Sequence, residues 1–286
     1  MNQSRLKYIP LLIGSTVGII LYLSVGWWGF LILFPWIGIS VTTGLHYQQK
    51  FINKKKILGR KICIIMILPA LLFFVPLVNH ENFQLEGVFL IVLAGYFSKG
   101  FIHYAVAKLF GPLIWGRGFC GWACWIAAIL DWLPIDGTKR KSISSKVKKI
   151  RYITLIISLS IPVILIYIFH YNVHSDYIGK SELQWMIIST IIYYFLSIPL
   201  AFYYADQRAF CKILCPVSLV MKVPSRFALL KKRPTGNDCV ECGICNKNCP
   251  MDIDIMSYIQ NHTSVKDTEC IMCGTCRVLC PTNAIK

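Results

Sequence analysis

The feature that most constrains the fold is a series of six apolar runs, each about as long as the bilayer core requires. A membrane-spanning helix needs about 17 to 25 apolar residues. Runs of this kind lie at residues 8–25, 30–45, 62–78, 87–107, 152–170 and 183–204. Only 15% of the residues are charged, against about 25% in a typical soluble domain. The sequence therefore predicts a mainly α membrane protein built on a six-helix transmembrane bundle.

The first two runs leave alternatives open. Only Gly26-Trp-Trp-Gly29 separates them, and the second run is short. One long tilted helix or a re-entrant pair would also accommodate these residues. A cleaved signal peptide is disfavoured, because no small-residue cleavage site follows the first run.

The positive charges test this arrangement of spans. Twenty-eight of the 30 Lys and Arg residues fall within residues 1–7, 46–61, 108–151 and 205–286. The connections on the other side, at residues 26–29, 79–86 and 171–182, hold only Lys180, while Lys99 lies inside a predicted span. By the positive-inside rule, both termini are expected on the cytoplasmic side of a bacterial-type inner membrane. The net charge of +17 then reflects topology, and no nucleic-acid partner is predicted.

The chain changes character near Lys231, where the apolar runs stop. We expect a membrane domain over residues 1–230 and a second domain over residues 231–286. Two cysteine runs in the second domain have bacterial ferredoxin spacing, each ending in Cys-Pro: Cys239, Cys242, Cys245 and Cys249, then Cys270, Cys273, Cys276 and Cys280. In such runs three close cysteines hold one cluster and the fourth crosses to the other. The sequence therefore predicts a 2[4Fe-4S] ferredoxin domain.

The spacing assigns the ligands of each cluster. One set is Cys239, Cys242, Cys245 and Cys280, and the other is Cys270, Cys273, Cys276 and Cys249. Gly243 and Gly274 follow the second cysteine of each run and supply the backbone freedom that a tight wrap requires. Zinc sites use four local ligands, and disulfides are disfavoured in a reducing cytoplasm.

Four further cysteines form two pairs, Cys120-x3-Cys124 and Cys211-x3-Cys215, which follow the fourth and sixth predicted spans. On a helix, residues four apart share a face with their Cβ atoms about 5 to 6 Å apart. A disulfide prefers about 3.8 Å. Together the pairs offer four thiolates, the complement of a third cluster. Copper or thiol chemistry and inert packing remain alternatives, and Cys63 is expected to be a small buried apolar side chain.

These motifs carry a resemblance. Residues 116–124 (GRGFCGWAC), 210–216 (FCKILCP) and the tandem ferredoxin runs resemble the membrane-bound polyferredoxin family that includes NapH-type and MauN-type quinol dehydrogenase components. Related modules occur in NosR-type regulators and CcoG-type copper reductases. Trp125 stands where that family usually has proline. Short outer connections leave no room for a NosR-type flavin domain, so the chain is most similar to a minimal NapH-like member.

The resemblance implies electron transfer between quinone and a partner redox protein or subunit, as a quinol dehydrogenase-type oxidoreductase component in the lipid bilayer. An ionisable residue inside a span is a functional candidate. Lys99 and His103, four apart in the fourth predicted span, are therefore expected to line a quinone headgroup pocket. Alternatively, Lys99 extends to the membrane surface and His103 lies at the interface. Haem ligation by His46 and His103 is a weaker hypothesis.

Two other functional classes use the same clusters. A copper or iron reductase would deliver electrons to a metal ion through the paired cysteines, and a redox-sensing regulator or assembly factor would respond to cluster state. The chain contains no Rossmann fingerprint, P-loop or CxxCH motif, so neither a nucleotide nor a c-type haem is indicated.

Overall fold

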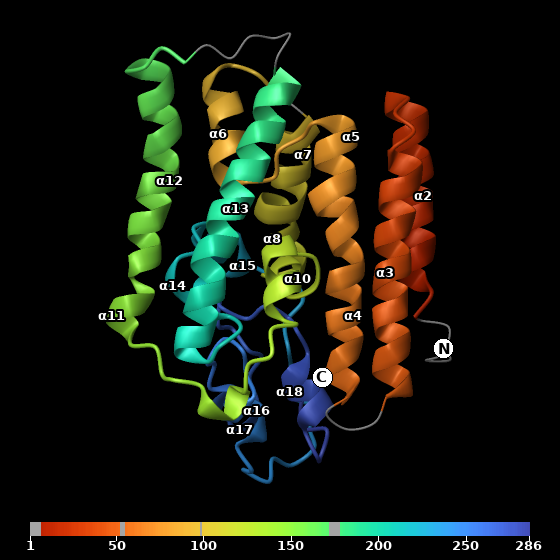
Figure 1. Ribbon diagram of the computed structural model, residues 1–286. Helices are drawn as coiled ribbons and strands as arrows, with labels where there is room; N and C mark the ends of the chain where they lie inside the picture. The colour runs from red at the N-terminus through yellow and green to blue at the C-terminus, as the bar shows by residue number, and fades with distance from the viewer. Residues whose placement is uncertain (1–6, 52–54, 98, 172–177) are drawn as a thin grey trace.

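A computed structural model describes residues 7–51, 55–97, 99–171 and 178–286. The long helices run side by side in a bundle, and the C-terminal residues form short helices beneath one end of it (Figure 1). Over the described residues the chain is helical apart from turns, loops and one isolated antiparallel bridge between Pro234 and Ile285. The helices are α2 (Ile9–Val25), α3 (Phe30–Lys50), α4 (Lys56–Pro69), α5 (Val75–Asn79), α6 (Leu85–Leu93), α7 (Lys99–Tyr104), α8 (Gly111–Trp115), α9 (Gly118–Trp122), α10 (Trp125–Leu130), α11 (Ser145–Lys148), α12 (Ile150–Tyr167), α13 (Ile178–Tyr204), α14 (Ala209–Ile213), α15 (Val217–Ser225), α16 (Ile244–Lys247), α17 (Ile255–Gln260) and α18 (Thr275–Leu279).

Some segments adopt wider or tighter turns than the α-helix. π-Helical turns at Ala70–Phe74 (η2) and Ala105–Phe110 (η3) join α4 to α5 and α7 to α8, and a 3₁₀ turn, η4, covers Gly137–Lys139. Turns of the π type frequently accompany functional sites. The η3 turn contains Lys108, whose surroundings are described below.

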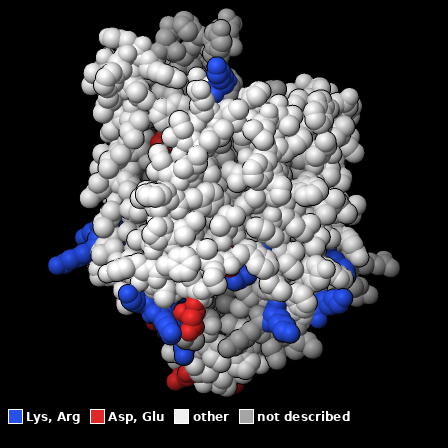
Figure 2. Space-filling model, in the orientation of Figure 1, with Lys and Arg blue, Asp and Glu red and all other residues white. Residues whose placement is uncertain are grey.

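The number of spans differs from the expected six. Among the described residues, four helical stretches are long and apolar enough to cross a membrane: 30–50, 56–78, 145–167 and 180–204. A fifth arises only if Phe101–Trp115 and Gly118–Leu130, which are bent by 102°, count as one span. Helix α2, with 17 residues, is shorter. Figure 2 shows a broad face almost without charged side chains over the bundle, with Lys and Arg gathered towards its lower edge, which is compatible with a membrane protein.

The prediction of one continuous span over residues 87–107 is wrong. Helix α6 has only nine residues, about 13 Å at 1.5 Å per residue. It ends where Gly95 adopts φ +83°, and the amides of Gly95 and Tyr96 bond back to the carbonyls of Val92 and Ile91. This is the glycine-dependent Schellman arrangement that ends helices.

The chain then turns back, and α7 packs against α6. His103 contacts Glu81, and Lys108 donates to the carbonyl of Phe83, so residues near the start of α6 lie beside residues near the end of α7. The segment is therefore a helical hairpin inside the bundle.

The residues before α6 do not form the expected outer connection. Residues 81–86 (ENFQLE) are all buried, although four of the six are polar. Lys108, grouped above with a cytoplasmic loop, is also buried, with 3% of its surface exposed. The predicted outer connection at residues 79–86 and the predicted cytoplasmic position of Lys108 are therefore wrong, because the hairpin places these polar residues inside the bundle.

A continuous apolar cluster links the bundle to the C-terminal region. It contains Leu85 and Val88 of α6, Cys120 of α9, and Met251 and Ile271 beyond residue 231. Side chains from the interior of the bundle are thus packed in one cluster with residues of both cysteine regions.

Candidate functional site

The cysteines of one predicted ferredoxin set line a single cavity. Cys249, Cys270, Cys273 and Cys276 face it together with Met251, Ile253, Ile255 and Ile271. The remote Cys249 lies within electrostatic reach of the three later cysteines. Burial raises the pKa of the Cys270 thiol to about 11 and that of Cys276 to about 12. Four thiols in one apolar cavity suit a metal cluster, whose binding would displace their protons.

The other predicted set is more open. Cys239 and Cys242 lie within electrostatic reach of Cys245. Cys280 directly follows α18, which packs against α16, the helix that carries Cys245. The Sγ of Cys280 accepts a hydrogen bond of 3.2 Å from the amide of Ala284.

The two cysteine loops have the same backbone course. Gly243 and Gly274 have φ of 65° and 75°, and the residues before the second cysteines, Glu241 and Met272, also have positive φ. The predicted use of glycine freedom in these loops is confirmed. It lets each loop curl so that three cysteines face one point.

The paired cysteines do not lie on continuous helices, so the prediction of one shared helical face is wrong. Cys120 is inside α9, whereas Cys124 is the extended N-cap of α10. Cys211 is likewise inside α14, and Cys215 follows the end of that helix. In each pair a short five-residue helix ends between the two cysteines.

Both pairs belong to an internal repeat that the sequence analysis missed. Residues 117–124 read RGFCGWAC and residues 208–215 read RAFCKILC, which share the pattern Arg-x-Phe-Cys-x3-Cys. In each copy the arginine is the N-cap of the short helix, and the phenylalanine carbonyl accepts from the amide of the second cysteine at 3.0 Å. Aligning the two pairs by their cysteines, and reading three residues upstream, would have revealed the repeat.

The two copies bring their four thiols together. Cys124 lies within electrostatic reach of Cys120 and Cys211, and Cys215 of all three other cysteines. In the described part of the chain, no three His, Cys, Asp or Glu side chains converge closely enough to hold one metal ion. The ferredoxin cysteines do not converge in this way either. In a [4Fe-4S] cluster the four cysteines bind four different iron atoms, so they need not converge on one point.

Both repeat arginines are buried beside these thiols. Arg117 and Arg208 are 0% and 1% exposed, and both lie within electrostatic reach of Cys211. Nε and Nη2 of Arg117 and Nε of Arg208 have no hydrogen-bond partner. Unpaired buried donors are costly, and a thiolate-bound cluster, which carries net negative charge, would supply acceptors and balance both cations. The residues present therefore fit a third cluster.

A buried carboxylate holds the first copy of the repeat against the second. Asp131 Oδ2 accepts from Arg60 Nη1 and Arg208 Nη2, both at 2.7 Å. The same arginines donate to the carbonyls of Gly121 and Cys120, at 2.8 and 2.9 Å. The backbone around Cys120 is therefore fixed by charged groups from α4 and from the second copy.

The C-terminal region is attached to the bundle by Glu269. This carboxylate accepts from Arg117, Arg151 and Lys222. Burial alone would raise its pKa, but hydrogen bonds from Arg151 and the charges of Arg117 and Arg151 outweigh that effect and lower the pKa to about 2. Because the residue next to it is Cys270, the attachment also positions a predicted cluster ligand.

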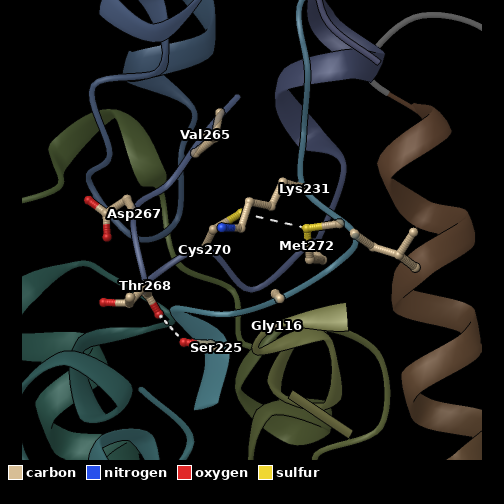
Figure 3. A pocket seen from close by; sticks show the side chains of 10 residues that line it. Gly116, Ser225, Lys231, Val265, Asp267, Thr268, Cys270 and Met272 are labelled. Carbon is tan, nitrogen blue, oxygen red and sulfur yellow. Dashed lines mark hydrogen bonds between the residues drawn. The ribbon is translucent and has the colours of Figure 1, made fainter. Parts of the chain in front are cut away.

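A small pocket opens beside this attachment. Gly116, Ser225, Lys231, Cys270 and Met272 are among the residues that line it, and the sulfur atoms of Cys270 and Met272 lie 4.0 Å apart (Figure 3). Ser225 donates to the carbonyl of Thr268 at 3.4 Å across its edge. The pocket lies where the bundle, the segment after α15 and the loop that carries Cys270 meet.

The expected quinone residues are only partly described. Lys99 begins α7, but its side chain lies outside the described residues. His103 Nδ1 contacts Glu81 Oε2 at 3.1 Å, and its ring lies 5.5 Å from that of Phe83. The structure therefore places a buried carboxylate beside His103.

The haem hypothesis is wrong. The ring of His103 lies against Phe30 at the start of α3, whereas His46 contacts Lys7 near the other end of that helix. Sixteen residues of helix separate Phe30 from His46, about 24 Å. The two histidines cannot ligate one iron.

Comparison with known protein families matches both cysteine regions. Residues 238–285 match a 4Fe-4S dicluster domain. Residues 104–142 and 188–235 match a 4Fe-4S binding domain, and these two stretches contain the two copies of the repeat. No solved structure matches the chain.

Three curated proteins are similar along much of the chain. The uncharacterized proteins MJ0750 and MJ0749 of Methanocaldococcus jannaschii are 29% and 27% identical to it, over 72% and 73% of this chain and 90% and 82% of their own lengths. The "Putative electron transport protein YccM" of Escherichia coli (strain K12) is 27% identical over 55% of this chain and 48% of its own length. With the two domain matches, the findings support an iron-sulfur protein with 4Fe-4S binding domains at both cysteine regions.

Proposed function

We propose that the chain is a membrane-anchored iron-sulfur protein that passes electrons between the quinone pool and a redox partner through three [4Fe-4S] clusters. Residues 1–230 form its membrane domain and residues 231–286 its ferredoxin domain, with both termini in the cytoplasm. The two ferredoxin clusters use the ligand sets assigned above, and the four paired cysteines hold the third. Each bound cluster supplies one-electron transfer at its site.

The observation that carries this proposal is the contact between the repeat and a ferredoxin loop. Trp122 Nε1 donates to the carbonyl of Met272 at 3.0 Å. Gly121 lies so close to the same loop that a Cβ atom there would be 2.1 Å from the carbonyl oxygen of Ile271. The first copy of the repeat and the loop between Cys270 and Cys273 are therefore in direct contact. This proximity suits electron transfer between the two cysteine sites.

Other findings support the remaining parts of the proposal. The relative YccM is named a "Putative electron transport protein", and helices α4, α12 and α13, which lie in stretches of membrane-spanning length, pack against the short helices of the repeat. A cluster at the end of such a bundle stands next to the lipid phase, where quinones dissolve. The link to quinone rests on this position and on the resemblance to NapH-type proteins.

The test is quinol-driven reduction of the clusters in wild-type protein, purified without oxygen and placed in lipid nanodiscs. A soluble ubiquinol or menaquinol analogue is expected to bleach the cluster absorbance, with dithionite defining complete reduction. If dithionite bleaches the clusters and neither quinol does, the quinone link is wrong. Rapid reoxidation by cupric ions, but not by quinone, would instead favour a metal reductase.

A second prediction concerns the reduction potential of the third cluster. A cation stabilises the more negative, reduced form, so Arg117→Gln is expected to lower this potential by roughly 60 mV, a tenfold change in a one-electron equilibrium. Potentiometric titration followed by electron paramagnetic resonance measures the shift. Arg117→Lys keeps the positive charge, so its potential should lie closer to that of the wild type.

Arg277→Gln is the control for this measurement. Arg277 is exposed on α18, directly after Cys276, and solvent screens its charge. Arg277→Gln is therefore expected to shift the reduction potential of each cluster by less than Arg117→Gln shifts that of the third cluster. Equal shifts in the two variants would contradict a specific role for the buried arginine.

A further inference from the structure

The buried residues before and within α6 form a polar cluster that the cysteine sites do not use. Glu86 stands in the first turn of α6 and is 6% exposed. Its Oε1 accepts from the hydroxyl of Ser158 at 2.6 Å and from that of Tyr193 at 2.5 Å. These donors come from α12 and α13, so three helices converge on one carboxyl group.

Two polar atoms at this place have no partner. Glu86 Oε2 and the hydroxyl of Tyr104 are both buried without a hydrogen bond, and the two residues lie within electrostatic reach of each other. Leaving a buried polar group unpaired is costly, because it has lost its hydrogen bonds to water. A ligand hydroxyl group could donate to Glu86 Oε2 and accept from the Tyr104 hydroxyl, and so would satisfy both atoms together.

Lys108 lies between this cluster and the paired cysteines. Its Nζ donates to the carbonyl of Phe83 and stands 4.4 and 4.8 Å from the ring centroids of Tyr104 and Trp125. It interacts electrostatically with Cys120, Cys124 and Cys215 on one side and with Glu86 on the other. The polar cluster and the thiols are thus neighbours within the bundle.

The position of Glu86 explains how a carboxylate is tolerated there. The positive end of the α6 dipole, two hydroxyl donors and the nearby Lys108 ammonium all offset the cost of burying this side chain. The titratable and charged groups that face it are Tyr193 from α13, Tyr104 from α7, Lys108 from η3 and, through Tyr193, Cys215. None of these contacts accounts for the unpaired Oε2.

We propose that Glu86 is the proton acceptor for a quinol whose hydroxyl binds between Glu86 Oε2 and Tyr104. This inference rests on the proposed function and locates its proton chemistry. Oxidation of one quinol to quinone breaks two O–H bonds and releases two protons and two electrons. Glu86 Oε2 takes the first proton and releases it to solvent before it takes the second, and two oxidised clusters take one electron each.

The assignment differs from the expectation at Lys99 and His103. His103 already contacts Glu81, so that carboxylate offers a matched control. Glu81→Gln and Glu86→Gln make the same chemical change at two buried positions five residues apart. Of these two variants, only Glu86→Gln removes the carboxylate on which α6, α12 and α13 converge.

The experiment measures quinol-driven cluster reduction in nanodiscs as a function of pH, with iron content and dithionite reduction recorded for every variant. Glu86→Gln is expected to slow the reaction about 100-fold, the range of a lost general base, and to flatten its acid limb. Glu81→Gln should stay near the wild-type rate. Near-normal reduction in Glu86→Gln, or a large loss only in Glu81→Gln, would overturn the assignment.

Tyr193→Phe keeps the test decisive if Glu86→Gln fails to retain its clusters. Loss of this donor leaves Glu86 Oε1 with one hydroxyl donor instead of two, so the acid limb should move while the iron content stays unchanged. An unmoved limb would contradict the proposal. Wild-type protein that dithionite reduces but quinol does not would overturn the proposed function itself, which separates the two failures.

Discussion

Replacing the four paired cysteines with serine is expected to lower the iron content from about twelve to about eight atoms per chain, since each [4Fe-4S] cluster holds four irons. The residues concerned are Cys120, Cys124, Cys211 and Cys215. Their thiols lie together beside two buried arginines with unpaired donors. Iron and acid-labile sulfide are counted on protein purified without oxygen.

Cys63→Ser is the control for this count. Cys63 is buried and donates weakly to the carbonyl of Trp122, yet it belongs to neither pair. Its variant should retain about twelve irons. A count near eight in the wild type and in the four-serine variant would mean that the pairs hold no cluster, and copper binding would then be the next measurement.

The ferredoxin region was the most predictable part of the molecule. Ligand spacing is a local property, because gaps of two residues and a following Cys-Pro dictate how a short loop can wrap a cluster. Gly243 and Gly274 adopt the left-handed conformation that this wrap needs. Cys249 lies with Cys270, Cys273 and Cys276, as the spacing indicated.

The interior of the bundle was predicted less well, because hydrophobicity alone does not reveal a reversal. Residues 87–107 are apolar throughout, yet Gly95 ends one half-helix and the chain turns back. The same reversal buries residues 81–86, whose polar composition is typical of a surface loop. Glycine inside an apolar run was the available signal.

Long-range ion pairs could not be predicted from the sequence. Arg60, Asp131 and Arg208 are far apart in the chain, and both arginines could equally be interfacial charges under the positive-inside rule. The structure buries all three in one contact. The Arg-x-Phe-Cys repeat, which the sequence analysis missed, was the available signal that Arg208 has a role beyond topology.

Asp131→Asn is expected to destabilise the bundle by about 3 to 5 kcal/mol, the cost of removing one partner of a buried ion pair. The substitution leaves Arg60 and Arg208 buried without their shared carboxylate, and these arginines hold the carbonyls of Gly121 and Cys120. Thermal unfolding in nanodiscs, followed by cluster absorbance, measures the loss. Iron from the third site should be lost before iron from the ferredoxin clusters.

Asp252→Asn separates this effect from a general loss of charge pairing. Asp252 also contacts cations, Arg140, Lys148 and Lys212, but its side chain is 28% exposed, and Lys212 keeps Asp206 as a partner. Partly solvated pairs contribute about 1 kcal/mol or less, so this variant should unfold close to the wild-type temperature. The Asp131 carboxylate pairs with both arginines that hold the backbone carbonyls of Gly121 and Cys120, so equal destabilisation of the two variants would contradict its role as the contact that fixes the third site.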